Sequence, residues 1–151
     1  MRSIHPAAAL LTTLLLCTPA HAADDGYNSG ASDDGLRPAR TQIAEKNWLS
    51  AVATLNAYTR ANPKSADGYN LLGYSYRQLQ RYNESLDAYQ RALALDPKHR
   101  GAHEYIGEAY LALGRLDKAK EHLDALDKIC FLPCEEYRDL KRSYEAALRS
   151  K

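Results

Sequence analysis

From Pro38 onward, apolar residues recur every three or four positions, which is the period of a helix with one buried face. The first clear stripe consists of Tyr69, Leu72, Tyr76 and Leu79. A polar stretch at 80–83 separates it from a second stripe made of Leu86, Tyr89, Ala92, Leu93 and Leu95. Asp96 and Pro97 then end this second helix, because proline disfavours the helical conformation of the residue before it. The pattern predicts a pair of helices joined by a short turn.

The same pattern returns at a fixed offset of 34 residues. Positions that repeat include Gly73 and Gly107, Tyr76 and Tyr110, and Pro63 and Pro97. So many matches at one period indicate an array of similar supersecondary units. We therefore predict an all-α solenoid with a partial repeat at 37–65 and full repeats at 66–99 and 100–133.

This repeat resembles the tetratricopeptide repeat (TPR). Its signature positions are filled in the central unit by Tyr69, Leu72, Gly73, Tyr76, Ser85, Tyr89, Ala92 and Pro97, and in the next unit by His103, Ile106, Gly107, Tyr110, Ala119 and Leu123. The first unit departs from the family pattern, because Gly35 and Pro38 fall where early apolar residues belong and shorten its leading helix. The third unit has Phe131 in place of the terminating proline.

The resemblance implies a concave groove, lined by the leading helices, that holds an extended segment of a partner. The matching positions here are Asn70, Tyr74, Arg77, Glu104 and Glu108. Spacings of three and four place each set on one helix face. We expect Asn70 to pair with a peptide amide, Tyr74 to stack on a side chain and Arg77 to hold a carboxylate. An ordinary solvated helix face is the alternative.

One more helix is predicted at 135–149, beyond the repeats. Its apolar stripe consists of Tyr137, Leu140, Tyr144, Ala147 and Leu148. Acidic residues begin it and basic residues end it, which complements the helix dipole. Because the last repeat of a solenoid needs a cover with a polar outer face, we interpret this helix as a C-terminal cap.

Residues 1–22 have the pattern of a signal peptide. A basic start precedes an apolar run from Ala7 to Cys17, too short to span a bilayer, and small residues stand at Ala20 and Ala22. We expect cleavage before Ala23 and a mature protein that is periplasmic or otherwise exported. After cleavage we expect no stable insertion into the membrane. The following Asp, Gly and Ser residues bury little, so 23–36 is predicted to be a disordered leader.

Cleavage would leave Cys130 and Cys134 as the only cysteines. An even pair in an oxidising compartment such as the periplasm favours a disulfide, and Pro133 bends the segment so that the two residues approach. A copper or zinc site built on two thiolates and a redox couple are the alternatives. Among the histidines, His103 falls at a core position of the repeat, and a site shared by His99 and His103 is a weaker possibility.

Composition and motifs limit the classes of function that the chain can have. A net charge of +1 gives no strong field to recruit nucleic acid. No glycine-rich phosphate loop and no convergent triad is evident, so we expect neither an enzyme nor a cofactor. Eleven tyrosines against one tryptophan and one phenylalanine suit a protein-contact surface.

The sequence thus predicts an adaptor that binds a protein or peptide partner, for assembly or maturation of an envelope complex. A small periplasmic metal-handling protein that uses Cys130 and Cys134 is the rival interpretation. A subunit that is stable only when docked is a third, because two and a half repeats make a small core.

Overall fold

The computed structural model describes residues 34–150, which form seven α-helices and one short 3-10 helix. These are η1 (Asp34–Leu36), α1 (Arg37–Ala44), α2 (Trp48–Ala61), α3 (Ala66–Gln78), α4 (Tyr82–Leu95), α5 (Arg100–Ala112), α6 (Leu116–Ile129) and α7 (Glu135–Arg149). This range contains no strand, so the predicted all-α class is confirmed. The predicted signal peptide and the leader up to residue 33 lie outside the described residues.

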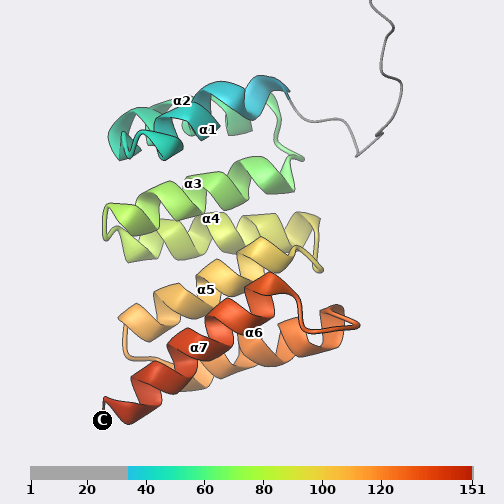
Figure 1. Ribbon diagram of the computed structural model, residues 1–151. Coiled ribbons are helices and arrows are strands. Elements are labelled where there is room, and N and C mark those ends of the chain that lie inside the picture. The colour runs from blue at the N-terminus through green and yellow to red at the C-terminus, as the bar shows by residue number, and fades with distance from the viewer. Residues whose placement is uncertain (1–33, 151) are drawn as a thin grey trace, which may run out of the picture. The chain divides into compact units, whose positions relative to one another are not determined.

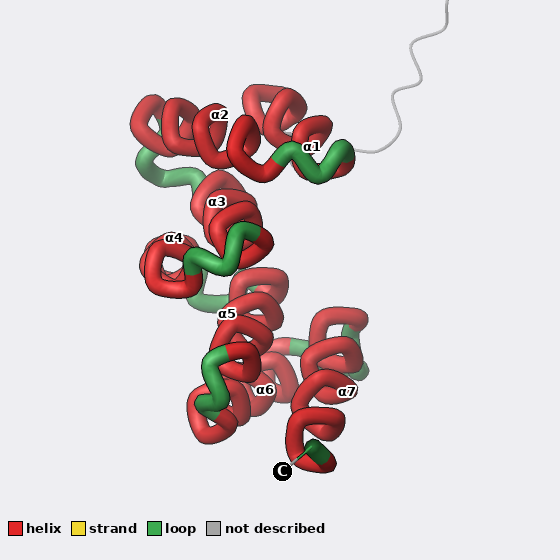
Figure 2. Tube along the Cα trace, turned by 90° about the vertical axis from the view of Figure 1, so that its left-hand side faces the viewer, coloured by secondary structure: helices red, strands yellow, loops and turns green. Residues whose placement is uncertain are grey.

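Consecutive helices pack as antiparallel pairs, and each pair stacks on the next (Figure 1). Helix α3 packs against both α2 and α4, and α5 packs against both α4 and α6. In Figure 2, α4 lies to the left of α3, and α7 lies to the right of α5. The leading helices α3 and α5 also contact each other directly. This arrangement confirms the predicted short solenoid of helix pairs.

The turn inside each pair has the same backbone geometry. Lys46, Gln80 and Gly114 are spaced by the repeat length and have φ angles of 57°, 58° and 71°. In each turn, the amide of the next residue donates to the carbonyl five positions before it, as Arg81 does to Tyr76 at 2.9 Å. This bond closes the C-terminal end of a leading helix. It requires one residue in the left-handed backbone conformation, which glycine adopts without steric cost.

Two glycines permit close helix contacts. A Cβ atom on Gly73 would lie 2.6 Å from the ring of Tyr89 in α4. A Cβ atom on Gly107 would lie 2.5 Å from Leu140 in α7. Both tyrosine and leucine are fully buried, so the missing side chains create the space that these two large residues fill.

The N-terminal boundary differs from the prediction. Leu36, which we assigned to the disordered leader, is fully buried and packs in the core cluster that contains Leu55 and Leu72. It is the last residue of η1, and α1 follows directly. The folded part therefore includes residues 34–36, which we had assigned to the leader, because burial of the apolar Leu36 side chain stabilises the core.

The C-terminal helix covers the last repeat as predicted. Helix α7 packs against α5 and α6, and its Leu140 is fully buried in a cluster with Leu123 and Leu126. The capping helix is confirmed. Within residues 34–150, no helix combines the length and the apolar character needed to cross a bilayer.

Candidate partner-binding face

Helices α3 and α5 place the five predicted contact residues in two clusters. Tyr74, Arg77 and Glu108 meet at the first, where Arg77 Nη1 lies 2.7 Å from Glu108 Oε2. Asn70 and Glu104 line a separate hollow near the start of α7. The structure thus brings residues of the two repeats together, although not as one continuous set.

Arg77 is held in place by its neighbours. Its guanidinium carbon lies 5.5 Å from the ring centroid of Tyr74 and 5.4 Å from that of Tyr105, so cation–π attraction adds to the ion pair. Burial lowers the pKa of Arg77, whereas Glu108 and Tyr89 raise it, and the net direction is upward. Arg77 therefore remains charged, and the carboxylate it holds is that of Glu108 in the same chain.

Three aromatic rings, which we call the aromatic row, run across the repeats at this point. The ring centroids of Trp48 and Tyr74 are 5.9 Å apart, and those of Tyr74 and Tyr105 are 5.1 Å apart. Neither Trp48 nor Tyr105 was among the predicted contact residues. The only sequence signal was the excess of tyrosine, because spacing along one helix does not reveal which rings of neighbouring repeats meet.

The hollow beside Asn70 is lined mostly by acidic side chains, and we call it the acidic hollow. Its volume is about 290 Å³, and its lining residues are Asn70, Gly101, Glu104, Tyr105, Glu135, Glu136 and Asp139. They come from α3, α5 and the first turns of α7. Tyr105 belongs both to this hollow and to the aromatic row, so it joins the two clusters.

Glu104 carries the largest electrostatic perturbation among the carboxyl groups of this face. Burial raises its pKa, repulsion from Glu108, Asp139 and Glu136 adds to the effect, and the pKa reaches about 8. Desolvation and like charges both disfavour the ionised form of a carboxyl group. At neutral pH this carboxyl group is therefore mostly protonated.

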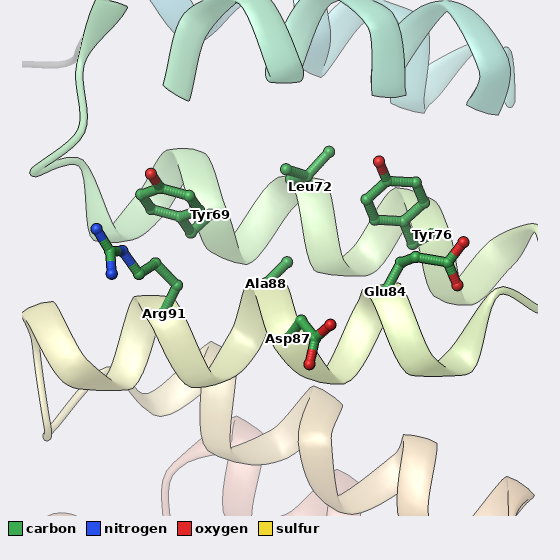
Figure 3. Close-up of a pocket in the computed structure, with 7 residues that line it drawn as sticks. All are labelled: Tyr69, Leu72, Tyr76, Glu84, Asp87, Ala88 and Arg91. Atoms are coloured by element: carbon green, nitrogen blue, oxygen red, sulfur yellow. The ribbon is translucent and has the colours of Figure 1, made fainter. Parts of the chain in front are cut away.

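A second groove lies between α3 and α4 and contains none of the predicted contact residues (Figure 3). Its volume is about 350 Å³, and Figure 3 shows Tyr69, Leu72, Tyr76, Glu84, Asp87, Ala88 and Arg91 around it. Leu72 is buried in the core beneath it, and the hydroxyl of Tyr76 accepts a hydrogen bond from Asn56 at 3.1 Å. These side chains thus connect the first two repeats.

His103 pairs with His122 and not with His99, the partner of the predicted alternative. Nδ1 of His103 lies 3.0 Å from Nδ1 of His122, and Nε2 of His103 lies 3.1 Å from the carbonyl oxygen of Pro97. Because a carbonyl only accepts, neutral His103 carries its hydrogen on Nε2 and accepts from His122. Burial, with His103 adding to it, lowers the pKa of His122 to about 4.

His99 takes no part in a site with His103. Its Nδ1 accepts the amide hydrogen of Ala102, and its Nε2 lies 2.9 Å from Asp67. Among residues 34–150, no three histidine, cysteine, aspartate or glutamate side chains are arranged to hold a metal ion.

The cysteine pair lies in the non-helical segment between α6 and α7. The structure joins Cys130 to Cys134 by a disulfide, with Cα atoms 5.8 Å apart, and in this form no thiolate is free. The intervening Phe131 is fully exposed, and Leu132 is largely exposed. Oxidation of the pair in the native protein stays a prediction.

Comparison with known proteins identifies the family. Residues 66–99 and residues 106–130 each match a family model described as tetratricopeptide repeat. Together with the stacked helix pairs, these matches show that residues 66–130 of the chain consist of tetratricopeptide repeats.

Three similar proteins place this family assignment in context. Protein bimA of Emericella nidulans is 34% identical over 85 residues, which are 56% of this chain. The chain spans only 10% of the length of bimA. The TPR2B domain of yeast Sti1, in a complex with pHsp70, has a TM-score of 0.71 at 20% identity, over 78% of this chain and 95% of that one. Yersinia enterocolitica SycD, in complex with a peptide of the translocator YopD, has a TM-score of 0.66 at 16% identity, over 77% of this chain and 88% of that one. At these identities the two solved structures show a shared fold.

Proposed function

We propose that this chain is a non-enzymatic adaptor that binds an extended segment of another protein across the face formed by α3 and α5. The observation that carries this proposal is the aromatic row, flanked by the Arg77–Glu108 ion pair and the acidic hollow. Proteins of the TPR fold are typically interaction scaffolds. The Sti1 and SycD structures, whose fold this chain shares, are complexes with partner segments.

The chemistry of the face suits recognition of a peptide. Tyrosine and tryptophan rings offer large contact areas at low cost in conformational entropy. Arg77 is already fixed by Glu108 and by two rings, so little further ordering is needed when a partner binds. The side-chain oxygen of Asn70 is buried without a hydrogen-bond partner in the described structure, so a small rotation of this side chain would present an unpaired acceptor to a donor from the partner.

We place this adaptor in the bacterial envelope, where it contributes to the assembly or maturation of an envelope complex. The support comes from the signal-peptide pattern of residues 1–22 and from the cysteine pair. N-terminal sequencing of the protein from its native cell tests this placement. A first residue at Ala23 is expected, whereas a mature chain that retains Met1 would contradict export.

Crosslinking in living cells tests the binding face. A photoreactive residue at Tyr74 is expected to capture a discrete partner, and the same residue at exposed Glu121 on α6 serves as the control. Equal capture from both positions would reject the face.

A paired substitution then tests the chemistry. Arg77→Gln combined with Glu108→Gln removes both charges and leaves neither one buried without its partner. We expect at least about tenfold weaker capture by a crosslinker at Tyr74, with the helical circular dichroism retained. Undiminished capture by the double variant would show that the ion pair is not part of the contact.

A further inference from the structure

The acidic hollow brings four carboxyl groups from two helices together. Glu104 comes from α5, whereas Glu135, Glu136 and Asp139 come from the first turns of α7. Its volume of about 290 Å³ is close to the lower limit for pockets that hold small organic groups. The hollow therefore has room for one extended side chain of a partner.

Basic residues of the chain compensate these charges only in part. Glu136 lies 3.6 Å from Arg100, and Asp139 lies 2.9 Å from the exposed Arg142. Within residues 34–150, Glu104 makes no ion pair, because Arg77 is engaged by Glu108. An excess of negative charge thus remains beside a half-buried carboxyl group.

Asn70 supplies a second and independent observation. Its side chain lines the hollow and is 8% exposed, and its Oδ1 has no hydrogen-bond partner in the described structure. Most buried acceptors in proteins are paired, and an unpaired one is destabilising. A small rotation of the Asn70 side chain, which lines the hollow, would bring this oxygen to a ligand that donates N–H groups, and the same ligand would pair with the carboxylates.

The geometry favours an organic cation over a metal ion. No three acidic side chains of residues 34–150 converge as metal ligands would. A guanidinium or ammonium group instead carries several N–H donors on a long apolar stem, and such stems pack against rings such as that of Tyr105.

We propose that the acidic hollow binds the cationic head of an arginine or lysine side chain in the partner segment. This inference rests on the proposed function, because it names the chemistry of the segment that lies on the same face. A basic residue of the partner would enter the hollow while its neighbours lie along the aromatic row.

The affinity of the acidic hollow for a cation must depend on pH. The groups that face Glu104 are Arg77 from α3, Glu108 and Tyr105 from α5, and Glu135, Glu136 and Asp139 from α7. The pKa of Glu104 is about 8 in the free protein, and a bound cation favours its ionised form. Affinity for the cation is therefore expected to rise about tenfold between about pH 6 and about pH 9.

Titration of the isotope-labelled full chain, followed by nuclear magnetic resonance, provides the test. The probe is the acetylated and amidated peptide Gly-Ser-Gly-Arg-Gly-Ser-Gly, whose arginine stays charged over the whole range. A matched peptide contains citrulline, which has nearly the same shape and no charge. We expect the arginine peptide to shift the backbone amide of Gly101, which lines the hollow, and the citrulline peptide to bind at least about tenfold more weakly.

Two variants complete the test. Glu104→Gln removes the titrating group and is expected to abolish the rise in affinity with pH, while Glu136→Gln should weaken binding and keep the rise. Glu145→Gln, an exposed position on the same helix α7, is the control and should bind like the unchanged protein.

The possible failures are distinct. Equal binding of the arginine and citrulline peptides, or a response of Gly101 to calcium chloride alone that matches the peptide response, would overturn the cationic specificity. No response of Gly101 to either peptide would overturn the hollow as a binding site. In each of these cases, partner capture from Tyr74 would still support the adaptor function, whereas absence of capture would count against that function itself.

Discussion

At the scale of single residues, the repeat imposes one backbone conformation on three unlike side chains. Lys46, Gln80 and Gly114 all adopt a positive φ angle, yet only the last is glycine. A residue with a Cβ atom in this conformation costs about 1–2 kcal/mol. The first two turns therefore retain a local strain that the third avoids.

Replacing Gln80 with glycine should stabilise the protein. The substitution removes the steric cost of the left-handed residue, and the greater freedom of glycine in the unfolded chain offsets part of that gain. We expect the free energy of unfolding to rise by about 0.5–1 kcal/mol in urea denaturation. Gln90→Gly, at an exposed position inside α4, is the control and should lower it by about 0.5–1 kcal/mol. If Gln80→Gly lowered the free energy of unfolding as Gln90→Gly does, the proposed backbone strain at Gln80 would be refuted.

His122 should make stability depend on pH. Its pKa is about 4 in the folded protein, against 6.5 for an unperturbed histidine, so the unfolded chain binds more protons between these values. The free energy of unfolding should therefore fall as pH is lowered through this window, by about 1–2 kcal/mol once partial exposure is allowed for. His122→Asn keeps an N–H donor but does not titrate. Urea denaturation near pH 7 and near pH 4.5 should show a smaller loss for this variant, and an equal loss would contradict the assignment.

At the scale of elements, the position of α7 depends on the burial of Leu140 and, where Cys130 and Cys134 are oxidised, on a covalent link. Leu140 occupies the space that Gly107 leaves on α5, and the oxidised pair would fix the segment from which α7 starts. Glu135, Glu136 and Asp139 lie on the same helix as Leu140. The docking of α7 therefore also sets the geometry of the acidic hollow.

Truncation of Leu140 should loosen the cap. Leu140→Ala removes a fully buried side chain and should lower the free energy of unfolding by about 2–5 kcal/mol. Leu148→Ala, on the same helix but 50% exposed, is the matched control and should cost less than about 1.5 kcal/mol. Thermal and urea denaturation measure both variants, and similar losses would mean that α7 is not anchored through Leu140.

Removal of the disulfide should have a moderate effect on stability. The link closes a loop of five residues, for which loop entropy gives about 2 kcal/mol. Replacing Cys130 and Cys134 together with serine should lower the free energy of unfolding by about this amount and speed hydrogen exchange at the start of α7. Peptide mapping of the native protein without reductant checks the premise, and recovery of two free thiols would disprove it.

At the scale of the whole described chain, the period of 34 residues was sufficient to predict the helix pairs and their stacking, because Gly73, Tyr76 and their repeats determine which helix faces are buried. The cap was predicted separately, from the apolar stripe of residues 135–149. The period also indicated the two helices that carry the contact residues. It did not predict the pairing of Arg77 with Glu108 or of His103 with His122. These contacts depend on the angles between neighbouring helices, which no spacing along one helix specifies.

Some features were hidden for a different reason. Leu36 follows a run of Asp and Gly residues, so composition assigned it to the disordered leader. Composition could not show that this one side chain is buried in the core. Tyr105 lies next to Glu104 along α5, so it was not counted on the same face, although it contacts Tyr74 of the preceding repeat. The local sequence pattern was therefore sufficient to predict the fold. The residues of the candidate binding face could be identified only from the packing between repeats.

The aromatic row also provides an optical reporter. Trp48 is the only tryptophan of the chain, and its ring lies 5.9 Å from that of Tyr74 at the proposed contact face. Its emission therefore arises from one known location, and a partner that covers this ring will change the polarity around it. Occupancy of the face can thus be read from the intrinsic fluorescence of the unlabelled protein, in real time and with Trp48→Phe as the blank.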